Sequence, residues 1–164
     1  MQPSSNDLER GAFVELGPGA RGLRAHYHEV GTGANYVLLV QSGGAGAAAY
    51  MSWRWNFDAF AGAGYHVLAP DMPGYGLTPP PDPQTRLTAP DFLVQFMDIL
   101  GVPTTHAMGN SMGSNAIARL ATQHPQRVRS VVFTGGERGS RPRSRAPCPG
   151  NWDKRHGPTS FGRC

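Results

Sequence analysis

The chain has 164 residues, of which 39% are hydrophobic, and its 15 Lys and Arg residues exceed its 11 Asp and Glu residues by four. This length suits one domain, and no apolar run approaches the roughly 20 residues that span a bilayer. The first ten residues are polar and do not resemble a signal peptide. We therefore expect a soluble cytoplasmic protein without a membrane partner.

The excess of positive charge belongs to the C-terminal part of the chain. Residues 137–164 hold seven of the 15 basic and two of the 11 acidic residues, which gives +5 there and leaves eight basic and nine acidic residues, or −1, in residues 1–136. This Arg- and Pro-rich composition cannot bury a core, and it lacks the interleaved aromatics of an ordered nucleic-acid site. We predict a disordered tail with no specific nucleic-acid partner.

Both cysteines of the chain, Cys148 and Cys164, lie in this tail. Two cysteines in a flexible end cannot support a disulfide framework, and neither their spacing nor their neighbours indicate a metal site. We predict no metal ligands.

The N-terminal half begins with strand-like patterns. Residues 1–12 are expected to be loose, and residues 13–16 and 23–29 are predicted to form an antiparallel pair at the edge of a sheet. Residues 36–40 are an apolar run that fits a central parallel strand. The glycine-rich loop that follows, residues 41–47, can turn a backbone N–H toward a neighbouring site.

Helix-like and strand-like patterns then alternate. A first helix is predicted over residues 53–61, a strand over residues 66–70, and a second helix over residues 90–100 with Phe92, Phe96 and Ile99 as its buried stripe. The aromatic stripe is interpreted as core packing.

Two loops separate these elements. Residues 71–78 read D-M-P-G-Y-G-L-T, a tight turn in which Asp71 is expected to accept hydrogen bonds from the backbone. Residues 79–83 are predicted to be a rigid proline-rich loop.

The last patterned stretch contains the motif G-N-S-M-G at residues 109–113. A strand-like run, residues 104–108, precedes it, and a helix-like run, residues 114–124, follows. Residues 128–134 are a β-branched run that predicts another parallel strand. The alternation of strands and helices indicates an α/β fold with a mostly parallel sheet.

The G-x-S-x-G motif at a strand-to-helix corner predicts a nucleophile. The sharp turn admits only glycine at Gly109 and Gly113, and it projects the hydroxyl of Ser111 from the top of the sheet. The backbone N–H of Met112, at the positive end of the helix, then points toward an oxyanion forming on the attacked carbonyl. Ser111 and Met112 are thus candidates for the nucleophile and for half of an oxyanion hole.

From about residue 23 to residue 136, the chain resembles the first half of an α/β-hydrolase. Within that fold it is most similar to the carbon–carbon bond hydrolases that act on meta-cleavage products of aromatic-ring degradation. The motifs that carry this likeness are H-Y-H-E at residues 26–29, the loop 42–47, D-M-P-G-Y-G at residues 71–76 and G-N-S-M-G at residues 109–113.

The resemblance implies roles for individual residues. Ser111 would be the nucleophile, and the backbone N–H groups of Met112 and of Gly43 or Gly44 would hold the oxyanion. The substrate would be a small organic molecule, and such enzymes use no metal or organic cofactor. An aspartate-nucleophile dehalogenase or epoxide hydrolase is disfavoured, since the elbow carries Ser111.

The sequence departs from the family pattern at two places. The oxyanion loop opens with Gln41-Ser42, where the family usually has His-Gly, so its anchoring hydrogen bonds must differ. The fold also normally continues for more than a hundred residues with a lid, two strands, an acid and a histidine base, whereas 28 residues follow Gly136.

We therefore expect a partial α/β-hydrolase domain in residues 1–136, truncated after the strand that follows the nucleophile helix. A coding frame that has shifted near Glu137 would explain the tail, and a short isoform is the alternative. Glu137 and His156 complete the order nucleophile, acid, histidine on paper, but nothing in the tail holds His156 beside Ser111. The other histidines, which are His26, His28, His66, His106 and His124, are interpreted as structural or solvated.

Two classes of function remain open from the sequence. The first is a serine hydrolase that cleaves a carbon–carbon or ester bond and is impaired by the truncation, with a carboxylesterase as the second enzymatic reading. The other is an inactive fragment or non-catalytic binding module. The strand over residues 128–134 would form an exposed apolar edge, which predicts self-association.

Overall fold

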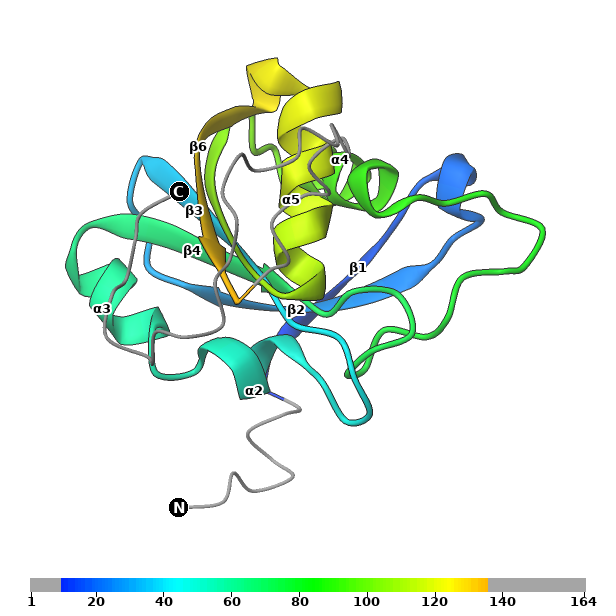
Figure 1. Cartoon of the computed structure of the whole chain (residues 1–164), viewed down its shortest axis with the longest axis horizontal. Coiled ribbons are helices and arrows are strands. Elements are labelled where there is room, and N and C mark those ends of the chain that lie inside the picture. Colours follow the sequence, from blue (N-terminus) through cyan, green and yellow to red (C-terminus); the bar gives the residue numbers. More distant parts are fainter. Residues whose placement is uncertain (1–9, 136–164) are drawn as a thin grey trace, which may run out of the picture.

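The computed structural model describes residues 10–135, so the predictions for residues 1–9 and for the tail, Glu137 and His156 included, lie outside them. Within the described range, one six-stranded sheet has the order β1-β2-β4-β3-β5-β6, with helices on both of its faces (Figure 1). This arrangement confirms the predicted α/β class.

The strands and helices follow one another as the sequence pattern indicates. The strands are β1 (Ala12–Glu15), β2 (Arg24–Val30), β3 (Asn35–Val40), β4 (Tyr65–Pro70), β5 (Thr105–Asn110) and β6 (Val128–Thr134). The helices are α2 (Ala49–Trp53), α3 (Phe57–Gly62), α4 (Ala89–Ile99) and α5 (Met112–Gln123), with the short 3-10 turns η1 (Pro18–Ala20) and η2 (Pro125–Arg127).

Strand direction divides the sheet into two parts. Strands β1, β2 and β4 pair antiparallel in that order, whereas β4, β3, β5 and β6 run parallel. The predicted β1–β2 pair is therefore confirmed, as is the parallel strand β3. His26 and His28 lie on β2, the inner strand of this edge pair, because β1 covers its outer side.

Strand β3 shows why the centre of the sheet is apolar on both faces. Its side chains alternate, so Leu38 and Val40 belong to the core under α4 and α5, whereas Val37 and Leu39 belong to the core under α2 and α3. All four are buried. A strand covered on both faces requires a continuous apolar run, which is what residues 36–40 provide.

Helix α4 begins with a capping box, in which Thr88 accepts a hydrogen bond from the N–H of Asp91 and the Asp91 carboxylate accepts one from the N–H of Thr88. Phe92 and Phe96 are fully buried, as predicted. The prediction for Ile99 is wrong, since 45% of this residue is exposed. The buried stripe of α4 instead includes Leu93 and Met97, which directly follow Phe92 and Phe96 in the sequence.

The single helix predicted over residues 53–61 is also wrong. Helix α2 ends at Trp53 and α3 begins at Phe57, and the N–H of Asn56 closes a turn on the carbonyl of Trp53 at 2.7 Å. Asn favours such turns over helix interiors because its side chain competes for backbone hydrogen bonds. The break still allows both aromatic side chains to be buried against the sheet.

Strand β6 pairs with β5 and has no other strand partner among residues 10–135. Two of its apolar side chains are about half exposed, Val132 at 49% and Phe133 at 53%. No helix in the described range has the length and apolar character needed to cross a bilayer.

Candidate active site

Ser111 occupies the corner between β5 and α5. Strand β5 ends at Asn110 and helix α5 begins at Met112, so the serine is the single residue between them. Its backbone has φ 51° and ψ −108°, in the left-handed half of φ space that non-glycine residues rarely adopt. Ser111 is exposed. The strained turn therefore presents the hydroxyl at the surface, as the motif predicts.

The glycines on either side of Ser111 are required by space. A Cβ on Gly109 would collide with the backbone of Gly113 and Ser114, and a Cβ on Gly113 would collide with the backbone carbonyls of Val40 and Gln41. These neighbours are main-chain atoms of the sheet and helix, which cannot rotate away. The elbow thus packs directly against the end of β3.

Hydrogen bonds join the elbow to the end of β6. The N–H of Ser111 donates to the carbonyl of Thr134 at 2.9 Å. The hydroxyls of Ser114 and Thr134 both donate to the carbonyl of Gly109, at 2.7 and 3.1 Å. The role of Ser114 was not predicted from the sequence. A hydroxyl on the buried face of the helix after the motif could have indicated it, because such a group needs a hydrogen-bond partner.

The structure brings two of the three predicted oxyanion residues together. Met112 is the first residue of α5, so its N–H has no acceptor within the helix. A Cβ on Gly43 would lie 3.2 Å from the sulfur of Met112 and 3.3 Å from the hydroxyl oxygen of Tyr75. The Gly43 backbone therefore lies beside the elbow. Gly44, with φ 121°, has open space around its Cβ position.

Gln41 anchors the loop after β3, which is the predicted oxyanion loop. Its side chain is completely buried, and its Oε1 accepts a hydrogen bond from the N–H of Met72 at 3.3 Å. This contact joins the loop after β3 to the loop after β4. The Nε2 of Gln41 has no hydrogen-bond partner among the described residues.

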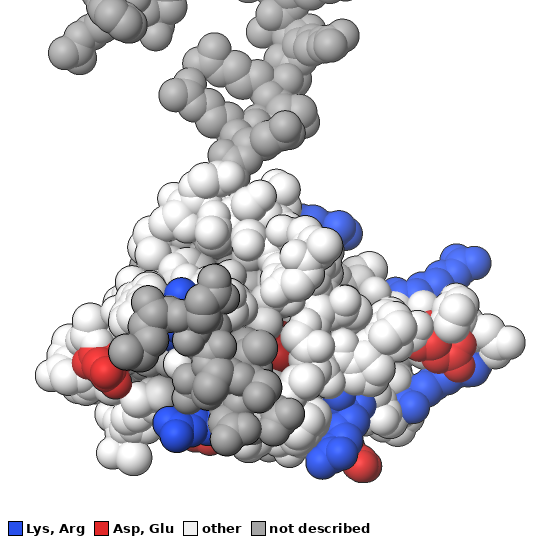
Figure 2. Space-filling model, turned by 90° about the horizontal axis from the view of Figure 1, so that it is seen from below, with Lys and Arg blue, Asp and Glu red and all other residues white. Residues whose placement is uncertain are grey.

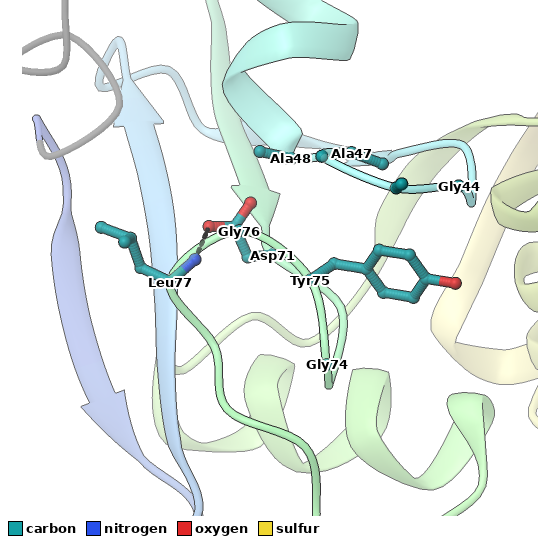
Figure 3. A pocket seen from close by; sticks show the side chains of 10 residues that line it. Gly44, Ala47, Ala48, Asp71, Gly74, Tyr75, Gly76 and Leu77 are labelled. Carbon is teal, nitrogen blue, oxygen red and sulfur yellow. Dashed lines mark hydrogen bonds between the residues drawn. The ribbon is translucent and has the colours of Figure 1, made fainter.

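Asp71 holds the loop after β4 with three hydrogen bonds. One carboxylate oxygen accepts from the N–H of Ala49 at 2.6 Å. The other accepts from the N–H of Leu77 at 3.0 Å (Figure 3), and it lies 2.8 Å from Nδ1 of His26. The predicted side-chain-to-backbone role of Asp71 is confirmed. The buried partnership with His26 was not predicted, because the two residues are 45 positions apart.

His28 lies on the same face of β2 as His26. Its ring stands edge-on to His26 and packs near Tyr50 and Phe57, with ring centres 4.9, 5.3 and 5.8 Å away. Burial in these surroundings lowers the pKa of His28 from 6.5 to about 4, and the neighbouring His26 contributes in the same direction. His28 is therefore neutral at physiological pH.

The other described histidines also have structural partners or lie away from Ser111. Nε2 of His66 lies 2.6 Å from a carboxylate oxygen of Glu29, and Nδ1 of His106 lies 2.8 Å from the hydroxyl of Ser130. Within residues 10–135, the Ser111 side chain forms no hydrogen bond, and no three His, Cys, Asp or Glu side chains are grouped to hold a metal ion. The candidate acid and base, Glu137 and His156, lie outside the described residues.

Two cavities flank the loop that carries Tyr75. The larger, about 730 Å³, lies between the loops after β3 and β4 and is lined by Gly44 to Ala48 and by Asp71 (Figure 3). The smaller, about 310 Å³, lies beside α5 and is lined by Met72 and Met112 among others. Tyr75 lines both cavities, and its hydroxyl oxygen lies beside Gly43.

Comparison with protein families gives one match that covers most of the chain. The profile of the alpha/beta hydrolase fold matches residues 36–154. The 2-hydroxy-6-oxononadienedioate/2-hydroxy-6-oxononatrienedioate hydrolase of Burkholderia vietnamiensis is 36% identical over 130 residues, which are 77% of this chain and 44% of that protein. The hydrolase of the same name from Paraburkholderia phymatum is 34% identical over 140 residues, 84% of this chain and 48% of that protein.

Solved structures give the same result. The meta-cleavage product hydrolase CumD from Pseudomonas fluorescens matches with a TM-score of 0.70 and 30% identity, covering 79% of this chain and 46% of that one. A Vigna radiata epoxide hydrolase mutant matches with a TM-score of 0.65 and 29% identity over 76% of this chain and 37% of that one. The resemblance inferred from the motifs is confirmed, and the chain spans about half the length of the curated relatives it matches.

Proposed function

Since this chain belongs to the α/β-hydrolase fold family, we propose that its elbow is the nucleophile of a serine hydrolase that cleaves a carbon–carbon or ester bond in a small organic substrate. The observation that carries the proposal is Ser111 itself. Its exposed hydroxyl, strained backbone and position at the start of α5 are the features that the chemistry needs.

The proposed reaction proceeds by acyl transfer. The Ser111 oxygen attacks the substrate carbonyl carbon, and the negative charge that develops on the carbonyl oxygen is stabilised by the N–H groups of Met112 and Gly43, with Gly44 as the alternative loop donor. Collapse of this intermediate breaks the scissile bond, and the leaving group takes up a proton. Water then hydrolyses the acyl–serine ester and releases the acid.

The attack also needs a general base within about 3 Å of the serine hydroxyl. None of the described histidines forms a hydrogen bond with Ser111. Glu137 and His156 are the candidates that follow Ser111 in the order acid, histidine, and loss of hydrolysis in His156→Ala with folding retained would support that assignment. Full hydrolysis in this variant would exclude it.

The names of the relatives favour a substrate class. The two similar proteins are hydrolases of a 2-hydroxy-6-oxo dienedioate, which is a diacid with a ketone carbonyl. We propose that this chain acts on a compound of that class. Conversion of 2-hydroxy-6-oxononadienedioate and of an aryl acetate, followed by chromatography of the products, would separate carbon–carbon from ester cleavage.

A serine-directed fluorophosphonate probe tests the nucleophile. We expect the full chain to be labelled, labelling to be lost in Ser111→Ala, and labelling to persist in Ser130→Ala, which changes another exposed serine. No labelling of the full chain, or equal labelling of Ser111→Ala, would contradict the proposal and favour an inactive fragment or a binding module.

We also propose self-association through β6. Its outer edge has no strand partner among the described residues, and Val132 and Phe133 are about half exposed. An apolar strand edge of this kind favours pairing with a second chain. Sedimentation should show dimers or larger species whose share falls in Phe133→Lys, whereas a monodisperse monomer would contradict this proposal.

The distribution of charge gives no support to a nucleic-acid partner. On the face shown in Figure 2, the described Arg side chains are scattered, and several lie beside Asp or Glu. Arg21 forms an ion pair with Asp82, and Arg127 forms one with Asp98. These arginines are therefore already neutralised by neighbours.

A further inference from the structure

The cavity of about 310 Å³ beside α5 has a mostly apolar lining. It lies between the first half of α5, the loop after β4 and the start of α4. Its floor and walls are side chains of Met72, Tyr75, Leu87, Met112 and Ala116. A volume of this size is at the lower end of the range for small-molecule sites.

One stripe of α5 forms the long side of this cavity. Met112, Asn115, Ala116 and Arg119 all line it, and their spacing of three, four and seven residues places them on one helical face. At a rise of about 1.5 Å per residue, Arg119 lies about 10 Å along the helix from Met112. The cavity therefore extends from the elbow toward a cationic end.

The two polar side chains of this stripe are available to a ligand. Asn115 and Arg119 are both exposed, and neither side chain forms a hydrogen bond or ion pair with any residue in the described range. By contrast, Thr88, which also lines the cavity, and the carboxylate of Asp91 are engaged with each other in the capping box of α4. The cationic end of the cavity thus has no internal counter-ion from that helix.

We infer that this cavity binds an organic carboxylate with an apolar body. The carboxylate lies at the Arg119 guanidinium, with the Asn115 amide as a second donor, and the apolar body contacts Met112, Tyr75 and Leu87. An Arg–carboxylate contact is charge-assisted and directional.

This inference deepens the proposed function, because it assigns a place beside α5 to a carboxylate of the proposed substrate, whose reacting carbonyl lies at Met112. That role as a substrate subsite rests on the proposed function. Binding of a carboxylate in this cavity is independent of the proposed function, since neither Arg119 nor Asn115 takes part in the proposed attack.

Binding of hydrocinnamate to the full chain tests the inference. This probe joins a phenyl ring to a carboxylate through a short chain, and hydrocinnamamide is its uncharged match. We expect hydrocinnamate to bind saturably, with shifts in the NMR signals of the Met112 and Ala116 amides, and hydrocinnamamide to bind at least about fivefold more weakly. Absence of saturable hydrocinnamate binding, or equal binding of the amide, would overturn the inference.

Three variants locate the site. Arg119→Gln removes the charge, and Asn115→Asp places a like charge beside the ligand carboxylate with almost no change of shape; each should weaken hydrocinnamate binding about fivefold or more. Arg129→Gln removes an exposed arginine of β6 that does not line the cavity, and it should leave binding unchanged. Unchanged binding in Arg119→Gln, or an equal loss in Arg129→Gln, would refute the assignment.

The same proteins distinguish this inference from the proposed function. Ser111→Ala should bind hydrocinnamate like the original chain while it loses fluorophosphonate labelling. Labelling of Ser111 without hydrocinnamate binding would overturn the carboxylate site alone. Hydrocinnamate binding without labelling would overturn the hydrolase proposal and leave the cavity as a carboxylate-binding site.

Discussion

The imidazole of His26 and the carboxylate of Asp71 form a pair that is completely buried, with Nδ1 and Oδ2 2.8 Å apart. The pair joins β2 to the loop after β4, and the same carboxylate accepts the backbone N–H groups of Ala49 and Leu77. Three segments of the chain thus depend on one side chain at the base of the larger cavity.

Replacement of this carboxylate should be strongly destabilising. In Asp71→Asn, one acceptor oxygen is replaced by an NH₂ group, so at least one of the three donors loses its partner. We expect the free energy of unfolding to fall by about 2 to 4 kcal/mol, measured by urea denaturation. Asp58→Asn, which changes an exposed residue of α3, is the control and should have little effect. Equal stability of the two variants would show that the network contributes little.

His28 should make stability depend on pH. Its pKa is about 4 in the folded chain, against 6.5 for the ordinary group. Above pH 6.5 the ring is neutral in both states. As the pH falls from 6.5 toward 4, the unfolded chain gains a proton that the folded chain does not, and the free energy of unfolding falls by about 1.4 kcal/mol per pH unit.

The contribution of His28 to the pH dependence of stability is measured by comparing the original chain with His28→Gln. Unfolding free energies measured from pH 7 to pH 4 should fall by about 2 to 3 kcal/mol more in the original chain than in His28→Gln. His124→Gln, which changes the histidine at the C-terminal end of α5 and leaves His28 in place, is the control and should retain the full dependence. Parallel curves for the original chain and His28→Gln would contradict the prediction.

The glycine at the end of the elbow motif should not tolerate a methyl group. In Gly113→Ala, the new Cβ would collide with the carbonyls of Val40 and Gln41, and we expect a loss of about 3 kcal/mol or more, or failure to fold. Gly62→Ala is the matched control in α3, where the Cβ position is open, and it should be neutral or slightly stabilising. Thermal unfolding of the two variants measures the contrast.

The strained backbone of Ser111 should appear as a stability difference between two inactive variants. Glycine accepts φ 51° without steric cost, whereas alanine keeps the strain. Ser111→Gly should therefore be about 1 kcal/mol more stable than Ser111→Ala in urea denaturation. At Ala118, in the interior of α5, replacement of alanine by glycine should act in the opposite sense. A less stable Ser111→Gly would mean that the observed φ carries no strain.

The order and type of the strands were predictable from local patterns. Residues 36–40 are apolar on both faces, and the structure places them in the centre of the sheet as β3. The G-x-S-x-G motif located the elbow for a steric reason, because only glycine fits at positions 109 and 113. The apolar run reflects the burial of both faces of β3, and the two glycines reflect the close backbone packing at the elbow.

Features set by tertiary packing were not predictable in the same way. Ile99 has the spacing of a buried residue, yet the face of α4 that meets the sheet is decided by Leu93 and Met97. The His26–Asp71 pair and the Ser114 hydrogen bond join residues that are distant in the sequence or ordinary in type. The cavity beside α5 combines residues from three separate segments, so no local pattern indicates it.

The hydrogen bond from the N–H of Ser111 to the carbonyl of Thr134 has a consequence for how the chain is made. Gly113 rests on Val40, which is synthesised long before it, but Thr134 leaves the ribosome 23 residues after Ser111. The N–H of Ser111 therefore gains this acceptor only after β6 has emerged and docked. During translation, the elbow lacks this backbone hydrogen bond until β6 is in place beside β5.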